Sequence, residues 1–222
     1  MMFKEIDSLI KKHLLLHEEI LPERKKELDE IAEWIHDQLK QNKKLDCIVI
    51  CTHNSRRSHL GQLMLALASE YYGIEGISAY SGGTEATAFN IRMVDALKDV
   101  GFEIQSTKTG ENPFYNIKWG DNSTQELKGV FSKNYAHEVN PQSNFMAILV
   151  CDSADRNCPV VLGASKRISL PYKDPKEFDN TKAESEAYKE KIFEMGREFF
   201  YLINRTPSRS KTWKVQKISP IH

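Results

Sequence analysis

The run Leu45–Cys51, "LDCIVIC", constrains the fold more than any other stretch of the sequence. It is short, apolar and rich in β-branched residues, which is the pattern of a strand buried on both faces. A helical pattern begins near Ser58 and ends at Gly73, and glycine is a common helix terminator. A buried strand followed at once by a helix predicts a βα unit, and βα units build parallel sheets.

The same alternation continues toward the end of the chain. Further strands are predicted at 77–83, 145–151 and 166–172, and further helices at 86–101 and 183–203. Residues 105–142 are rich in polar and turn residues, so we predict a long irregular segment there. The pattern as a whole predicts an α/β three-layer sandwich with a central four-stranded parallel sheet, in a domain spanning residues 45–222.

Residues 1–44 are predicted to form a helical extension that precedes this domain. Apolar residues recur at three- and four-residue steps in a first helix and again after Pro22, which suits the first turn of a second helix. The two amphipathic helices predict a helical hairpin, and the sequence leaves open whether it packs on the body of the protein or on a partner.

The charge balance excludes several classes of function. Lys and Arg number 31, and Asp and Glu also number 31, so the formal net charge is zero and nucleic-acid binding has no electrostatic support. The apolar stretches are too short to span a membrane, and the charged N-terminal stretch does not match a signal peptide. We therefore expect a cytoplasmic protein with no membrane or nucleic-acid partner.

The cysteines point to chemistry at one edge of the sheet. There are four of them, Cys47, Cys51, Cys151 and Cys158, too few for a disulfide scaffold of this length. Their C-x3-C and C-x6-C spacings do not match the close pairs of a zinc site, so no metal is expected. Cys51 and Cys151 each end a predicted strand, and parallel sheets bind ligands at that edge. Cys47, inside the first strand, is expected to be structural.

The octet Cys51–Ser58, "CTHNSRRS", lies between the first strand and its helix. Backbone N–H groups in such a loop, together with the helix N-terminus, form a cradle for a tetrahedral oxyanion. Arg57 lies six positions after Cys51, and its planar guanidinium is suited to grip two oxygens of that anion. The positive surroundings favour a thiolate at Cys51, which attacks the bound phosphorus or arsenic in line.

Other residues of the octet are expected to support this cradle. Ser58 is predicted to hydrogen-bond the thiolate, and Asn54 to hold the loop by bonding backbone groups. The predicted oxyanion-binding residues are Thr52, His53, Asn54, Ser55, Arg56, Arg57 and Ser58.

The segment "VICTHNSRRS" resembles the phosphate-binding loop of the low-molecular-weight protein tyrosine phosphatase superfamily, which includes the thioredoxin-coupled arsenate reductases. The later segments "YSGGTEATAFN", "LVCDSADRNCP" and "YKDPKEFD" resemble the same family. The resemblance covers roughly residues 45–203 and leaves the N-terminal helices outside it. His53 stands where the family usually has glycine, and histidine tolerates a positive φ better than most residues.

The resemblance implies arsenate reduction as the leading function. Cys51 is then the nucleophile, Arg57 and the loop amides clamp the oxyanion, and Asp174, in an Asp-Pro pair, is the general acid. Cys151 attacks Cys51 after arsenate has reacted. Cys158 then attacks Cys151, which moves the disulfide outward for reduction by thioredoxin or another thiol. No cofactor is implied beyond that reductant.

Two other functions stay open on the sequence alone. The same loop and acid fit a tyrosine phosphatase acting on a phosphoprotein or a small phosphoester through a phosphocysteine intermediate, with Cys151 and Cys158 as bystanders. The third is a non-catalytic oxyanion-binding or redox-sensing module whose output passes through the N-terminal helices.

Overall fold

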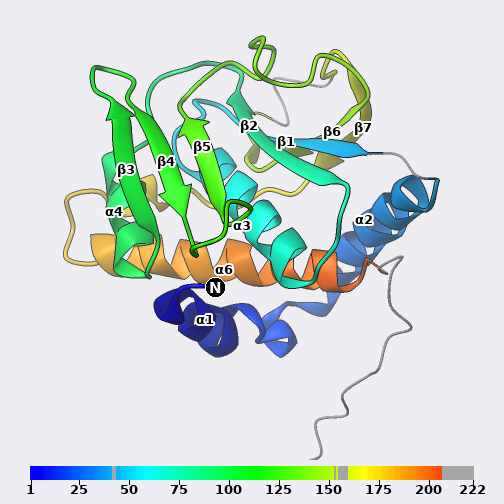
Figure 1. Ribbon diagram of the computed structural model, residues 1–222, viewed down its shortest axis with the longest axis horizontal. Coiled ribbons are helices and arrows are strands. Elements are labelled where there is room, and N and C mark those ends of the chain that lie inside the picture. Colours follow the sequence, from blue (N-terminus) through cyan, green and yellow to red (C-terminus); the bar gives the residue numbers. More distant parts are fainter. Residues whose placement is uncertain (42–43, 153, 155–159, 207–222) are drawn as a thin grey trace, which may run out of the picture.

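A four-stranded parallel sheet forms the centre of the protein. The computed structural model describes residues 1–41, 44–152, 154 and 160–206. The strands are β1 (Leu45–Cys51), β2 (Ile77–Gly83), β6 (Phe145–Leu149) and β7 (Ala164–Ser169), in the order β2-β1-β6-β7. Every pairing between neighbours is parallel, which confirms the predicted α/β architecture (Figure 1).

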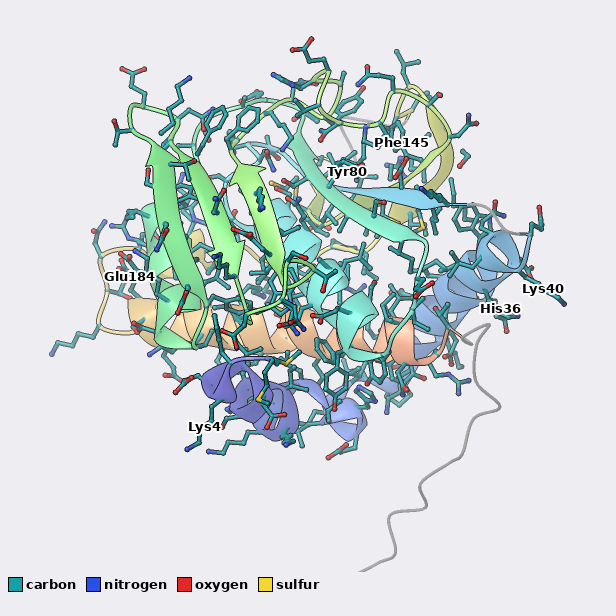
Figure 2. The ribbon with its side chains drawn as sticks, in the orientation of Figure 1. Lys4, His36, Lys40, Tyr80, Phe145 and Glu184 are labelled. Atoms are coloured by element: carbon teal, nitrogen blue, oxygen red, sulfur yellow. The ribbon has the colours of Figure 1, made fainter. Side chains whose placement is uncertain are left out.

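The two faces of the sheet are covered differently. Alternate residues of β1 point to opposite faces, so Cys47 and Val49 pack against α3 (Arg57–Tyr71) and α6 (Glu184–Asn204). Ile48 and Ile50 face the other way, where they form a smaller cluster with Phe145, Val161 and Tyr80. Figure 2 labels Tyr80 and Phe145 on this side of the molecule.

Residues 105–142 are more regular than the sequence predicts. A three-stranded antiparallel sheet spans residues 103–130, with β3 (Glu103–Lys108), β4 (Phe114–Lys118) and β5 (Glu126–Val130) in sequence order. The prediction of an irregular segment was wrong because the turn residues between these short strands dominated the pattern. The clearest alternation of buried residues is Tyr115 and Ile117 in β4 and Trp119 just after it, and Val130 of β5 is buried in the same core.

The N-terminal helices pack on the body of the protein. Helix α1 (Lys4–Leu9) continues into a π-helical turn at Ile10–Leu14, and a short 3-10 turn at His17–Glu19 precedes α2 (Pro22–Lys40). The π-helical turn and α2 both contact α6, which lies between α1 and the rest of the protein in Figure 1. Ile6, Ile10 and Leu14 are fully buried in the same core as β1 and α3.

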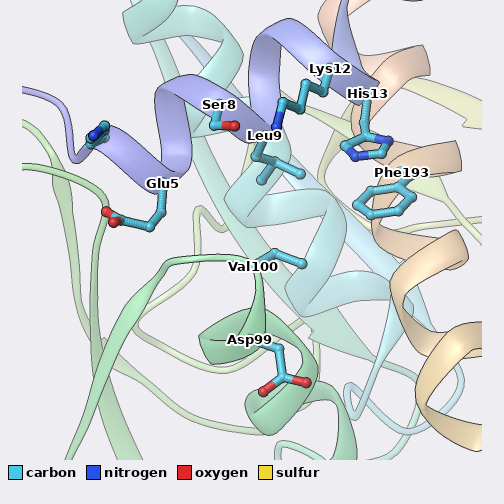
Figure 3. Close-up of a pocket in the computed structure, with 9 residues that line it drawn as sticks. Glu5, Ser8, Leu9, Lys12, His13, Asp99, Val100 and Phe193 are labelled. Carbon is cyan, nitrogen blue, oxygen red and sulfur yellow. The ribbon is translucent and has the colours of Figure 1, made fainter.

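A pocket lies where the N-terminal extension packs against the α/β domain. It lies between α1, the end of α4 (Ile91–Asp99) and α6, and has a volume of about 410 Å³ (Figure 3). Within it the His13 ring stacks on Phe193 with 3.9 Å between ring centres. Among the described helices, none combines the length and apolar composition needed to cross a bilayer.

Leu14→Ala tests whether the extension shares the core. The substitution removes a fully buried side chain, so we expect the free energy of unfolding in urea to fall by about 2–5 kcal/mol. Leu21→Ala is the control, because Leu21 is 69% exposed and should change stability by no more than about 0.5 kcal/mol. Equal, small effects of both substitutions would show that the extension is not part of the cooperative fold.

Candidate active site

Cys51 ends β1 at the carboxyl edge of the sheet, and α3 begins six residues later at Arg57. The cysteine is only 4% exposed. Its Sγ lies 3.1 Å from the Oγ of Ser58, which is fully buried in the first turn of α3. The sulfur therefore has a hydroxyl partner in the position that the sequence predicts for stabilising a thiolate.

Asn54 holds the loop that joins Cys51 to α3. Its side chain is completely buried: Oδ1 accepts a hydrogen bond of 2.8 Å from the backbone N–H of Lys133, and Nδ2 donates one of 2.8 Å to Ser58 Oγ. Its φ of 44° lies in the left-handed region, where asparagine is among the best tolerated residues. The positive φ of this loop thus falls at Asn54 and not at His53, the residue that stands where the family usually has glycine.

The carbonyl groups of the loop are turned outward and satisfied there. The acceptors are Cys51, Thr52, His53 and Ser55, and their donors are Thr84, Glu85, Thr87, Asn90 and Ser132. Within the described residues, the backbone N–H groups of residues 53–57 donate to no protein acceptor. Such groups are the donors that an oxyanion requires.

Gly83 allows this outer layer to approach the loop. A Cβ at position 83 would lie 2.7 Å from both the N of Asn54 and the O of Thr52, and 2.2 Å from the O of Glu85. All three are backbone atoms, so a larger residue at this position would displace the loop.

Arg57 and Asp174 are brought into contact by the loop that follows β7. Arg57 donates from Nη1 to the carbonyl of Tyr172 at 2.8 Å, and from Nη2 to Asp174 Oδ2 at 2.6 Å. The other carboxylate oxygen of Asp174 accepts from the N–H of Lys176 at the start of a 3-10 turn, Pro175–Phe178. The arginine and the acid predicted from separate motifs thus share one site.

Arg56 has a different environment from its neighbour. Its Nε donates to the hydroxyl of Tyr188 on α6 at 2.8 Å, and its Nη2 to Asp179 at 3.1 Å. The Tyr188 hydroxyl in turn donates to Asp179 at 2.7 Å. This network holds the Arg56 guanidinium against α6.

A second sulfur lies beside the loop. Cys151 follows β6, is 1% exposed, and has its Sγ 3.5 Å from the Oγ1 of Thr52. The backbone N–H of Ala154 also points to this sulfur, at 3.4 Å. Cys158, the other predicted resolving residue, lies outside the described residues. Cys47 is enclosed in β1, and burial raises the pKa of its thiol, in keeping with a structural role.

A buried histidine and a buried lysine lie behind the loop. His59 stacks on Phe89 at 4.2 Å and its Nδ1 lies 3.1 Å from Ser81 Oγ. Burial, with a smaller contribution from Lys133, holds its pKa well below the ordinary value. Burial also lowers the pKa of Lys133, to about 8. Sequence reasoning missed this support because Ser81, Phe89 and Lys133 belong to three separate segments.

Comparison with known proteins places this geometry in context. No family model matches the chain. Arsenate reductase 2 of Staphylococcus epidermidis (strain RP62A) is 28% identical over 126 residues, covering 57% of this chain and 75% of that protein. Arsenate reductase of Staphylococcus aureus (strain N315) is 27% identical over the same shares. The crystal structure of the low-molecular-weight protein tyrosine phosphatase from T. tengcongensis aligns with a TM-score of 0.50 and 16% identity, covering 72% of this chain and 98% of the phosphatase.

The chain has the low-molecular-weight tyrosine phosphatase fold. The resemblance predicted from "VICTHNSRRS" is thus confirmed, and the sequence relatives agree with the expectation of an enzyme of this fold. The alignment spans nearly all of the phosphatase but not all of this chain. The described residues hold no group of His, Cys, Asp and Glu side chains arranged to bind a metal.

Asn54→Gly tests whether the asparagine side chain maintains the loop between β1 and α3. Glycine keeps the left-handed backbone accessible but removes both side-chain hydrogen bonds, so we expect phosphate affinity to fall by about tenfold or more. Asn144→Gly is the matched control, because Asn144 also has a positive φ, 59°, but is exposed. Unchanged phosphate affinity in Asn54→Gly, measured by calorimetry, would contradict this role.

The buried His59 predicts a loss of stability in acid. A histidine whose folded pKa is depressed stabilises the protein fully above its unfolded pKa of about 6.5 and less as the pH falls below it. We expect the free energy of unfolding to drop by up to about 1.4 kcal/mol per pH unit between roughly pH 6.5 and 5. His59→Gln should make this slope shallower when urea unfolding is measured at a series of pH values. An identical slope in His59→Gln and the parent would refute the assignment.

Proposed function

We propose that this protein is an arsenate reductase that uses Cys51 as its nucleophile and Cys151 as the thiol that resolves the arsenic adduct. The observation that carries the proposal is the position of the Cys151 sulfur, 3.5 Å from Thr52 Oγ1 in the residue next to Cys51. The similarity to arsenate reductases of Staphylococcus supports it.

The first step forms a sulfur–arsenic bond. Arsenate binds to the N–H groups of residues 53–57, with Arg57 over two of its oxygens. The Cys51 thiolate attacks arsenic, and the hydroxyl group of the hydrogen arsenate leaves as water after Asp174 supplies one proton. The 2.6 Å hydrogen bond from Arg57 Nη2 to Asp174 Oδ2 supports Asp174 in the role of the acid.

The second step transfers two electrons to arsenic. The Cys151 thiolate attacks the sulfur of Cys51 and a disulfide forms. The sulfur–arsenic bond breaks with its electron pair moving to arsenic, which leaves as arsenite. Cys158 then attacks Cys151 and releases Cys51 as a thiolate. An external dithiol, for which we propose thioredoxin in the cytoplasm, reduces the Cys151–Cys158 disulfide.

The expected result with purified protein, thioredoxin and its reductase is arsenate-dependent consumption of NADPH. Cys151→Ser should abolish turnover while leaving phosphate affinity within about twofold, because it removes the resolving thiol and leaves the loop intact. Cys158→Ser should stall after one turnover with a Cys51–Cys151 disulfide. Cys47→Ala should retain activity, since Cys47 is enclosed in β1. A Cys151→Ser variant with normal arsenate turnover would disprove the mechanism.

A phosphatase is the second candidate. The hydrogen bond between Arg57 and Asp174 favours a phosphatase as much as it favours an arsenate reductase. Such an enzyme would form a phosphocysteine at Cys51 and would not need Cys151. Hydrolysis of a phosphoester that survives both Cys151→Ser and Cys158→Ser, with no arsenate-dependent oxidation of thiols, would establish this candidate instead. Absence of turnover on either class of oxyanion would leave a binding or redox-sensing module.

A further inference from the structure

Arg24 connects the N-terminal extension to the loop that carries Asp174. It lies in the first turn of α2, and its side chain is only 16% exposed. The guanidinium donates from Nε to Glu198 on α6 at 2.8 Å, from Nη1 to Glu27 at 2.9 Å, and from Nη2 to the carbonyl of Pro171 at 3.2 Å. One side chain thus bonds α2, α6 and the segment after β7.

The partners of Arg24 on α6 and after β7, Glu198 and Tyr172, are both buried. The hydroxyl of Tyr172 donates to Glu198 Oε2 at 2.6 Å, the same oxygen that Arg24 contacts, and the Arg24 guanidinium lies 4.9 Å from the centre of the Tyr172 ring. Tyr172 and Glu198 are 4% and 8% exposed. Burial raises the pKa of Glu198, and Arg24 opposes that change. Without Arg24, a buried carboxylate would lose its cation and Pro171 its hydrogen-bond donor.

The segment that Arg24 holds is the one that holds Arg57. The carbonyl of Tyr172 accepts from Arg57 Nη1, and Asp174 accepts from Arg57 Nη2. The backbone N–H of Tyr172 bonds the carbonyl of Val150, just before Cys151. Residues 171–174 are therefore fixed between Arg24 on one side and the predicted oxyanion clamp on the other.

We propose that Arg24 is a positioning residue for the oxyanion site and acts on Arg57 through the segment Pro171–Asp174. Arg24 itself touches none of the proposed reacting atoms. The proposal rests on the proposed function only in assigning the oxyanion to Arg57 and the loop amides, and it holds for a reductase and for a phosphatase alike. It gives the N-terminal extension a catalytic purpose in addition to its part in the core.

Arg197 provides a matched control for this proposal. Its side chain is 15% exposed and it also joins the extension to α6, through the carbonyl of His13 and the carboxylate of Glu19. It makes no contact with residues 171–174 among the interactions of the described residues. Loss of Arg197 should therefore weaken the docking of the extension without moving Arg57.

The test compares Arg24→Ala, Arg24→Lys and Arg197→Ala in the full chain, with inorganic phosphate as the probe in calorimetric titrations. We expect Arg24→Ala to weaken phosphate binding on the order of 2- to 30-fold, the range typical of remote coupling. Arg24→Lys should lose less phosphate affinity, because the ammonium group keeps a positive charge near Glu198. It should still lose some, because an ammonium group cannot reproduce the planar guanidinium. The phosphate affinity of Arg197→Ala should stay within about twofold of that of the parent, even if its midpoint of unfolding in urea falls.

A double-mutant cycle with Arg57→Ala separates positioning of Arg57 from a purely structural role of Arg24, because a purely structural role gives no coupling between the two residues. Once Arg57 is absent, Arg24→Lys should have no further effect on phosphate affinity. The same fold loss with and without Arg57, or equal losses in the Arg24 and Arg197 variants, would overturn the proposal. If Arg24→Ala does not fold, the lysine variant carries the cycle.

The outcome also separates this inference from the proposed function. Phosphate binding that depends on Arg24 and Arg57 in a protein without arsenate turnover would sustain the inference and end the reductase proposal. Absence of phosphate binding in the parent protein would overturn both, because Arg57 would then clamp no oxyanion.

Discussion

The carboxamide of Asn54 is the contact on which the rest of the site depends. It bridges the backbone of Lys133 and the hydroxyl of Ser58 inside a fully buried position. This bridge fixes the left-handed turn of the loop, and the turn directs the loop carbonyls outward to their donors. Within the described residues, the backbone N–H groups of residues 53–57 therefore have no protein acceptor and are available to an anion. The Ser58 hydroxyl is oriented toward the sulfur of Cys51.

The site is assembled from segments that are remote in sequence. The end of β1 supplies Cys51 and the loop after it the N–H groups, the segment after β6 supplies Cys151, and the loop after β7 supplies Asp174. In a parallel sheet these positions meet at one edge. The N-terminal extension reaches the same edge through Arg24, which bonds the segment that Arg57 also bonds. We propose that this contact links the docking of the extension to the position of Arg57.

Local patterns were sufficient to predict the elements that carry the chemistry. Both β1 and β2 have the predicted bounds, since each is a short run with turn signals at its ends. The antiparallel sheet within residues 105–142 was missed because its strands are short and only one face is buried, so turn residues dominate the sequence. The roles of Lys133, Tyr172 and Asp179 could not be predicted, because each acts through a contact formed only by the tertiary fold.

The most direct test of the central claim is the rate of alkylation of Cys51 by iodoacetamide, followed by peptide mass spectrometry, with and without inorganic phosphate. If the loop is an oxyanion cradle with this sulfur at its base, saturating phosphate should protect Cys51, and chloride at the same ionic strength should not. Alkylation of Cys51 at one rate in phosphate and in chloride would contradict the account.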